Sequence, residues 1–497
     1  MTLRLLFLPL CLFTLLFTGC LNLSPDYAPP DLSGGMPAAY REDTGSGNGS
    51  AAQAAKRTAP GAANPEDKGW REARPADLGA RSPWWIVFSD PLLDDLMQKL
   101  GAANQNLAAT AATLRVSLAQ IGIARSAFFP GLGAPFSTER AGAQNKSANS
   151  SYSGGLQSSW EISFWNALPA LEAAQAEAAA AAADFAALRL LLQAELAQNY
   201  FLLRSLDSRQ ELYESTIIAY RRAAQLTNSQ FRGGMATRVD YDQAAAQLAG
   251  AEAQLAALKR QRAELEHGIA LLCGQAASGF NLPRASLAGH IPRVPPGLPA
   301  ALLERRPDVA AAERRVASAN EEIGLARAAW FPSLTLGGDF LWKAAGWQSA
   351  ALYSWSLGPG GILNIFEGGR ILAQSEAARA GYDREIANYR QSVLSALKEV
   401  EDNLSALRYL EQEAAARGRA AVAARSALRI ALSQYEGGLT TYLQVVSSQT
   451  TALSNESSVI EVQGLRLATV VNLIKALGGG FSREEIAPLI GRAGGEE

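Results

Sequence analysis

The sequence predicts an α+β membrane protein in which very long helices alternate with short, two-faced β-segments, arranged as two internal repeats. Three observations support this fold class. Apolar residues follow helical spacing over long segments, aromatic and polar residues alternate between those segments, and two motifs recur at nearly the same separation. A helix of about 60 residues is roughly 90 Å long, so such helices do not fit inside one compact core.

The internal repeat rests on two pairs of motifs. Residues Ile121–Pro130 recur with most identities kept at Ile323–Pro332, and Ser229–Gly234 recurs as Ser433–Gly438. Because both pairs lie roughly two hundred residues apart, the body consists of two equivalent halves and is not a solenoid of short units. We expect a first repeat over 81–285 and a second over 286–482.

Each repeat contains one very long helix. Apolar residues three or four positions apart mark a coiled-coil seam, and no proline occurs between Pro169 and Phe231. In the second repeat the seam residues are Tyr382, Ile386, Tyr389, Val393, Leu397, Val400, Leu404 and Leu407. In the first repeat they are Phe185, Leu188, Leu192, Leu196, Leu203, Leu206, Tyr213, Ile217 and Tyr220.

Strict alternation between the helices predicts β-hairpins over about 132–162 and 333–366. Such strands suit lipid on one face and water on the other, although an ordinary soluble hairpin pair was the alternative. The apolar or aromatic face of the second hairpin holds Leu334, Leu336, Phe340, Trp342, Tyr353, Trp355 and Leu357. In the first hairpin one face holds Tyr152, Gly154, Leu156, Ser158 and Trp160.

Four strands cannot stand alone in a bilayer. A membrane sheet must close so that no backbone edge faces hydrocarbon, and barrels need at least about eight strands. Several copies must therefore contribute to one barrel, and the long helices would continue it as a tube.

The N-terminus reads as a lipoprotein signal over residues 1–19. Arg4 precedes an apolar run too short to span a bilayer, and the run leads through Thr18 and Gly19 into Cys20. This order resembles a lipoprotein cleavage site, with Phe17 where leucine is usual, and predicts acylation of Cys20; a plain signal peptide was the alternative. Leu21 favours the outer membrane of a Gram-negative bacterium. A Gly/Ala/Pro/Ser-rich linker completes segment 20–80, and 483–497 is a tail.

Composition excludes several functions. The chain has 45 Lys and Arg against 47 Asp and Glu, so it has no basic surplus for nucleic acid. Two histidines outside any recognisable motif predict neither a metal site nor an envelope hydrolase, so we expect no enzyme. Cys273 reads as a small buried hydrophobe, and no disulfide is expected. No uninterrupted apolar run predicts a spanning helix after the signal.

The chain resembles the TolC-like outer-membrane efflux factors, in particular the lipoprotein branch that serves resistance-nodulation-division pumps. The resemblance implies a homotrimer with a twelve-stranded barrel above a periplasmic helical tunnel. It would be a passive exit duct for antibiotics or other cargo, reached through a periplasmic adaptor from an inner-membrane pump, with no cofactor beyond the lipid on Cys20. The motifs are Gly19-Cys20 with Pro25, Tyr27 and Pro29; Trp84-Trp85 to Asp90-Pro91; Glu195–Phe201; Arg305-Arg306-Pro307-Asp308; and Ala396–Asp402.

The resemblance also suggests functional residues. Gly233-Gly234 and Gly437-Gly438 would be helical hairpin tips at the adaptor end, where glycine also serves as a helix cap. Leu443 would form an apolar gate ring, while Ser447 stands at a position that is acidic in the family. Asp240 and Asp242 are possible acidic substitutes or ordinary solvated helix residues. The cargo stays open, and a non-conducting envelope scaffold is the rival function.

Overall fold

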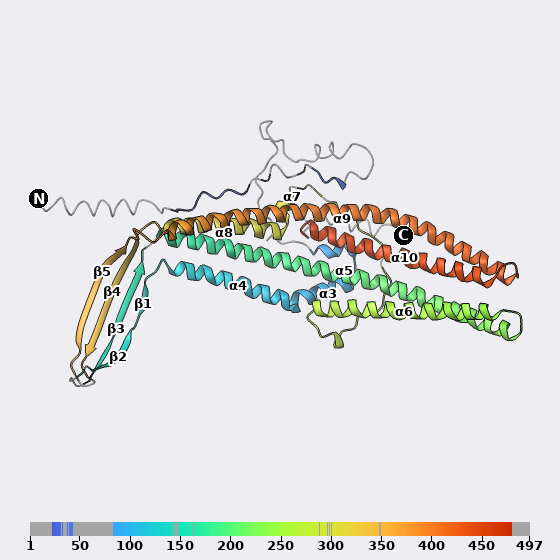
Figure 1. Cartoon of the computed structure of the whole chain (residues 1–497), viewed down its shortest axis with the longest axis horizontal. Helices are drawn as coiled ribbons and strands as arrows, with labels where there is room; N and C mark the ends of the chain where they lie inside the picture. The colour runs from blue at the N-terminus through green and yellow to red at the C-terminus, as the bar shows by residue number, and fades with distance from the viewer. Residues whose placement is uncertain are drawn as a thin grey trace, which may run out of the picture. The chain divides into compact units, whose positions relative to one another are not determined.

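The computed structural model (Figure 1) describes the chain as two compact units. Unit 1 comprises Met1–Gly34, Ala111–Asp184 and Asp308–Ser392, and unit 2 comprises Gly35–Thr110, Phe185–Pro307 and Val393–Glu497. The signal, Cys20, most of the linker and the tail lie outside the described residues. Those are 22–30, 32, 37, 39–42, 83–142, 144, 148–162, 164–287, 289–295, 297, 299, 301–346 and 349–479.

The order of elements repeats: a helix, a β-hairpin, a very long helix and a shorter helix. The first series is α4 (Gln105–Ser126), β1 (Gly131–Gly133), β2 (Phe136–Ala141), β3 (Asn149–Glu161), α5 (Phe164–Arg232) and α6 (Arg238–Leu272). The second is α8 (Pro307–Ala328), β4 (Ser333–Ala344), β5 (Leu352–Ile362), α9 (Arg370–Glu436) and α10 (Tyr442–Ala476). The remaining elements are η2 (Trp84–Phe88), α3 (Pro91–Ala103), η3 (Ala277–Gly279) and α7 (Ala301–Arg305).

Both predicted hairpins form, and they join into one antiparallel sheet in unit 1 with the order β1-β3-β4-β5. The first strand is interrupted, because Pro135 cannot donate to the ladder, so β1 and β2 lie one after the other along the same edge of β3. The sheet is therefore four strands wide.

The register confirms the predicted faces. Phe340 lies opposite both Leu156 and Trp355, and Trp342 opposite Tyr353, and directly paired residues point to the same side of a sheet. Trp355 is 79% exposed in the single chain, and Tyr353 and Leu357 are exposed as well, so the part of this apolar face on β5 is largely uncovered. The opposite face carries Asp339, which accepts a hydrogen bond from Ser356 at 3.1 Å.

The long helices are confirmed, and α5 begins earlier than the sequence indicated. It starts at Phe164, so Pro169 lies inside the helix. Pro169 is the sixth residue of the helix, so it removes the one bond that its amide would have donated to the carbonyl of Trp165, and the helix continues through it. The seam residues Leu196, Leu203 and Val400 are fully buried, as the spacing predicts.

Unit 2 contains the buried Cys273, in agreement with the sequence. Its thiol donates to the carbonyl of Leu96 at 3.8 Å, at the end of α6. In the same unit the buried Arg306 donates to Glu399 at 2.8 Å and to the carbonyl of Ala476 at 3.1 Å. Arg306 thus satisfies one of the free carbonyls at the end of α10, which explains the charged motif before α8.

Helix α4 differs from the expectation that no helix after the signal is apolar enough to span a membrane. By length and composition α4 could cross a bilayer, and it is the single such helix among the described residues, although no apolar run after the signal predicted one. Leu107 is its one buried residue, and Val116, Leu118 and Ile123 are exposed. The expectation relied on uninterrupted apolar runs, and α4 mixes apolar residues with Thr, Ser, Gln and Arg.

Candidate gate and helical tips

The two Gly-Gly breaks form the same cap in both repeats. Gly234 and Gly438 have φ of 74° and 70°, the left-handed region that favours glycine. The amide of Met235 donates to the carbonyl of Gln230 at 2.8 Å, and Leu439 donates to Gln434 at the same distance. This is the Schellman pattern, so the second glycine of each pair ends the long helix and turns the chain into its shorter partner.

The aspartates proposed as acidic substitutes both have local roles at the start of α6. Asp240 completes a capping box with Thr237, whose side chain accepts from the Asp240 amide. Asp242 accepts two hydrogen bonds from Arg238 at 2.9 and 3.0 Å. The charge of Asp240 also contributes, after burial, to the raised pKa of Tyr435.

One face of the start of α10 packs on α6 of the first repeat, and the opposite face is exposed in the single chain. Tyr442 and Val445 are buried against Ala244 of α6. Leu443 and Ser447 are both exposed. Because they lie four residues apart, they share one face of α10, pointing away from its contact with α6. This is the face on which a ring between copies would form.

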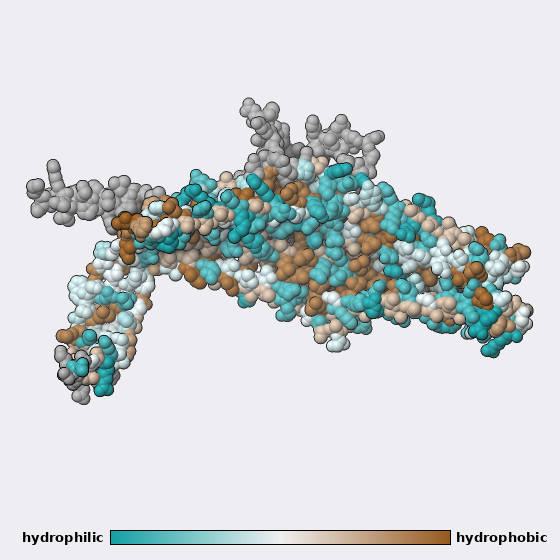
Figure 2. Space-filling view, in the orientation of Figure 1, coloured by the Kyte–Doolittle hydropathy of each residue, from teal (hydrophilic) through white to brown (hydrophobic). Residues whose placement is uncertain are grey.

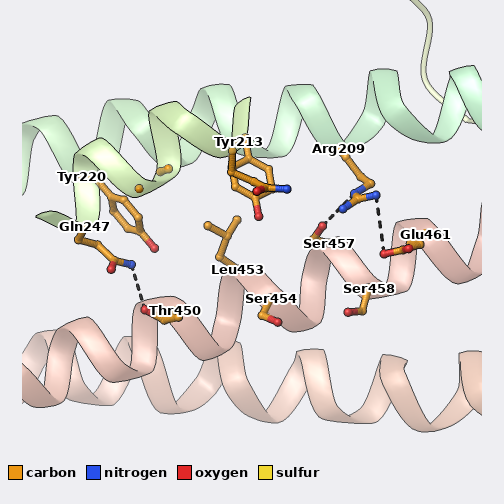
Figure 3. Close-up of a pocket in the computed structure, with 13 residues that line it drawn as sticks. Arg209, Tyr213, Tyr220, Gln247, Thr450, Leu453, Ser454, Ser457, Ser458 and Glu461 are labelled. Atoms are coloured by element: carbon orange, nitrogen blue, oxygen red, sulfur yellow. Dashed lines mark hydrogen bonds and ion pairs between the residues drawn. The ribbon is translucent and has the colours of Figure 1, made fainter. Parts of the chain in front are cut away.

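Farther along α10 a cavity of about 430 Å³ separates it from α5 and α6 (Figure 3). Polar and apolar groups line it in nearly equal parts, and few bonds among the described residues cross it. Gln247 donates to Thr450 at 3.0 Å, while Arg209 donates to Ser457 at 3.0 Å and lies 3.7 Å from Glu461. At the far side Gly464 meets Ser205 so closely that a Cβ would lie 2.6 Å from the serine Cβ.

Two exposed apolar residues at the tips were missed by the sequence analysis. Met235 is 78% and Leu439 is 82% exposed, each directly after its glycine pair. Figure 2 shows hydrophobic groups at the turn between α9 and α10. The signal was present in the sequence, because both repeats place a large apolar residue at this position. Both side chains are exposed in the single chain.

Comparison with known proteins extends the match to most of the chain. The sequence profile of the family described as outer membrane efflux protein matches residues 96–275 and 298–479. Outer membrane protein OprJ of Pseudomonas aeruginosa is 30% identical over 414 residues, which are 80% of this chain and 86% of that protein. The pyoverdine export outer membrane protein OpmQ of the same organism is 28% identical, covering 85% and 93%.

Solved structures agree with this family. The outer-membrane channel OprN superposes with a TM-score of 0.77 at 28% identity, covering 93% of this chain and 99% of that one. The CmeC outer membrane channel of Campylobacter jejuni shares the fold, with a TM-score of 0.79 at 20% identity over 95% and 98% of the two chains.

The relatives are channel and transport proteins, which supports the duct over the scaffold that the sequence left open. The resemblance drawn from the motifs is confirmed over both repeats. The chain therefore belongs to the outer membrane efflux protein family and is an outer-membrane channel of an efflux system.

Proposed function

We propose that three copies of this chain close into one twelve-stranded barrel continued by a helical tunnel. The main support is the sheet itself: among the described residues, β5 and the β1/β2 side are unpaired edges, and the apolar side chains of β5 are exposed. An open edge in hydrocarbon costs several kcal/mol per unsatisfied group, so only closure with further copies satisfies it. The exposed apolar residues of α4 would then pack on a neighbouring copy.

Purified protein in mild detergent tests this proposal. We expect a species three times the mass of one chain, a shift to the monomer position on heating before electrophoresis, and discrete ion conductance in planar bilayers. A properly inserted protein that stays monomeric and conducts nothing would contradict it.

The gate is proposed at the start of α10. Leu443 from each copy would close the tunnel mouth as an apolar ring, with Ser447 supplying no charge. The cavity beside Thr450 and Ser457 supports movement of this end of α10, because the few bonds across it are side-chain hydrogen bonds and one long ion pair, which water can replace.

The helical tips are proposed to contact a periplasmic adaptor that links the channel to an inner-membrane pump, of the resistance-nodulation-division type that the resemblance implies. Met235 and Leu439 beside the glycine pairs supply the apolar surface for this contact. A photo-crosslinking amino acid at Leu439 should capture the adaptor in cells. The same group at Val422, which is exposed on α9 before the turn, serves as control.

The channel is proposed to be acylated at Cys20 and to impose little selectivity of its own. Relatives are named for pyoverdine export in one case and toluene efflux in another, so chains of this architecture carry chemically different cargo. A shared duct leaves selection to the pump and adaptor, and its own conduction needs no cofactor. Mass spectrometry of the mature N-terminus tests the acylation.

A further inference from the structure

The segment that follows the acylation site lies along α8 in unit 1. Tyr27 donates to Glu313, Asn320 donates to the carbonyl of Pro25 at 2.7 Å, and Arg327 donates to the carbonyl of Leu23 at 3.0 Å. The contact point therefore moves toward the end of α8, where β4 begins, as the chain is followed back toward Cys20. The segment Asn22–Tyr27 is called the N-terminal strap below.

Two further contacts fix the strap nearest to Cys20. The hydroxyl of Ser24 donates to Glu321 at 2.5 Å, and the side-chain amide of Asn22 donates to Glu172 of α5 at 2.8 Å. The strap thus touches helices from both repeats. Burial and the neighbouring Glu321 raise the pKa of Glu172, the carboxyl group that Asn22 contacts.

Asn320 of α8 makes a specific contact with the N-terminal strap. Its side chain is 2% exposed, and its amide donates to the strap at 2.7 Å and, more weakly, to Glu321 at 3.4 Å. Without the strap this amide would lose its shorter hydrogen bond, the one to the carbonyl of Pro25. Gly324 provides the space, because a Cβ there would lie 2.1 Å from the hydroxyl oxygen of Ser24.

The first repeat supplies an internal comparison, because α4 contains the same motif at Ile121–Pro130. Gly122, the counterpart of Gly324, faces open space, since a Cβ added there would have no atom within 4 Å. Arg125, the counterpart of Arg327, is exposed with no side-chain partner among the described residues. The three polar contacts are absent as well: Glu313, Asn320 and Glu321 correspond to Ala111, Leu118 and Ala119.

We propose that α8, with the start of α5, forms a dedicated docking groove for the N-terminal strap and so holds Leu23 near the end of α8 that leads into β4. The shared Gly and Arg belong to the repeat, whereas the buried amide and the carboxylates occur only where the strap binds. Asn22 follows Cys20 by two residue steps, a reach of about 7 Å. The role in placing a lipid rests on the proposed acylation, and the docking itself does not.

Cross-linking in the full-length chain tests the docking without the lipid. The lipoprotein signal is replaced by an ordinary cleavable one, Cys20 by alanine, and Ser24→Cys is combined with Glu321→Cys. A short thiol cross-linker should join this pair efficiently. The matched control combines Ser24→Cys with Ala119→Cys, the same position in the first repeat, and should give little product.

Variants of the groove complete the test. Gly324→Leu should reduce the 24/321 cross-link to the level of the control pair, while Gly122→Leu should leave it unchanged. Asn320→Leu, which installs the first-repeat residue, should also weaken the cross-link and guards against misfolding of Gly324→Leu. Equal yields for the 24/321 and 24/119 pairs, or equal effects of the two glycine variants, would overturn the docking groove.

Conductance of the same preparations separates this inference from the proposed channel. A protein that cross-links at 24/321 but conducts nothing speaks against closure of the barrel and leaves the groove intact. A protein that conducts but does not cross-link at 24/321 supports closure of the barrel and speaks against the docking groove.

Discussion

The thiol of Cys273 is enclosed at the end of α6, and burial raises its pKa to about 11. An unfolded cysteine ionises near about 8.5, so the folded state holds its proton more tightly. The resulting stability is complete below about pH 8.5 and is lost as the pH rises toward about 11. We expect Cys273 to resist a thiol reagent at pH 8 and to react once urea unfolds the chain. Rapid reaction of the folded protein would show that the site opens.

Leu443 carries the prediction for the gate. Leu443→Ala removes apolar contact worth about 2 kcal/mol from the closed ring, which corresponds to a rise of roughly tenfold or more in the open population. Uptake of a large antibiotic by cells, and the open probability in bilayers, should both increase. Val422→Ala is the control, because Val422 is exposed on α9 and has no proposed part in the ring. Unchanged uptake in an inserted Leu443→Ala protein would remove Leu443 from the gate.

At the scale of elements, the two glycines of each tip have separable roles. Gly438→Ala forces a side chain into the left-handed region and should cost about 1 kcal/mol of stability. Gly437 does not have a positive φ, and a Cβ there meets only ordinary contacts from 3.5 Å, so Gly437→Ala should be neutral. Denaturant midpoints of the two variants in detergent provide the comparison. Equal midpoints would show that the cap does not limit stability.

At the scale of the whole molecule, the two faces of the sheet give opposite predictions for neighbouring residues. Leu357 lies on the apolar face opposite Gly338, and Ser356 on the other face opposite Asp339. An arginine on the lipid face costs about 2–4 kcal/mol near the bilayer midplane, and three copies multiply that cost. Leu357→Arg should abolish the heat-modifiable assembly in outer membranes, while Ser356→Arg should assemble and alter ion selectivity. Normal assembly of Leu357→Arg would reverse the assignment of the faces.

Much of this architecture was readable from residue patterns. Period-2 alternation around Phe340 and Trp355 predicted the strands and their faces, and the repeated motifs predicted that both halves share one order of elements. Spacing of three and four predicted which residues of α5 and α9 are buried. These features are local: each depends on the periodicity of one backbone conformation, which the sequence records directly.

Other features depended on which segments meet. No pattern indicates that Asn320 is buried beneath residues almost three hundred positions earlier, that Arg306 reaches the end of α10, or that a cavity lies beside Thr450. The start of α5 before Pro169 was missed because an internal proline usually ends or kinks a helix, whereas α5 continues through it.

The sequence by itself determined the membrane sheet, the long helices, the tips and the family, because periodicity, glycine placement and motif order are properties of the chain alone. The tertiary structure alone decided that two similar helices, α4 and α8, differ in what they bind. The motif residues Gly122 and Gly324 are the same, and only the neighbours brought to them in space distinguish an open surface from an occupied groove.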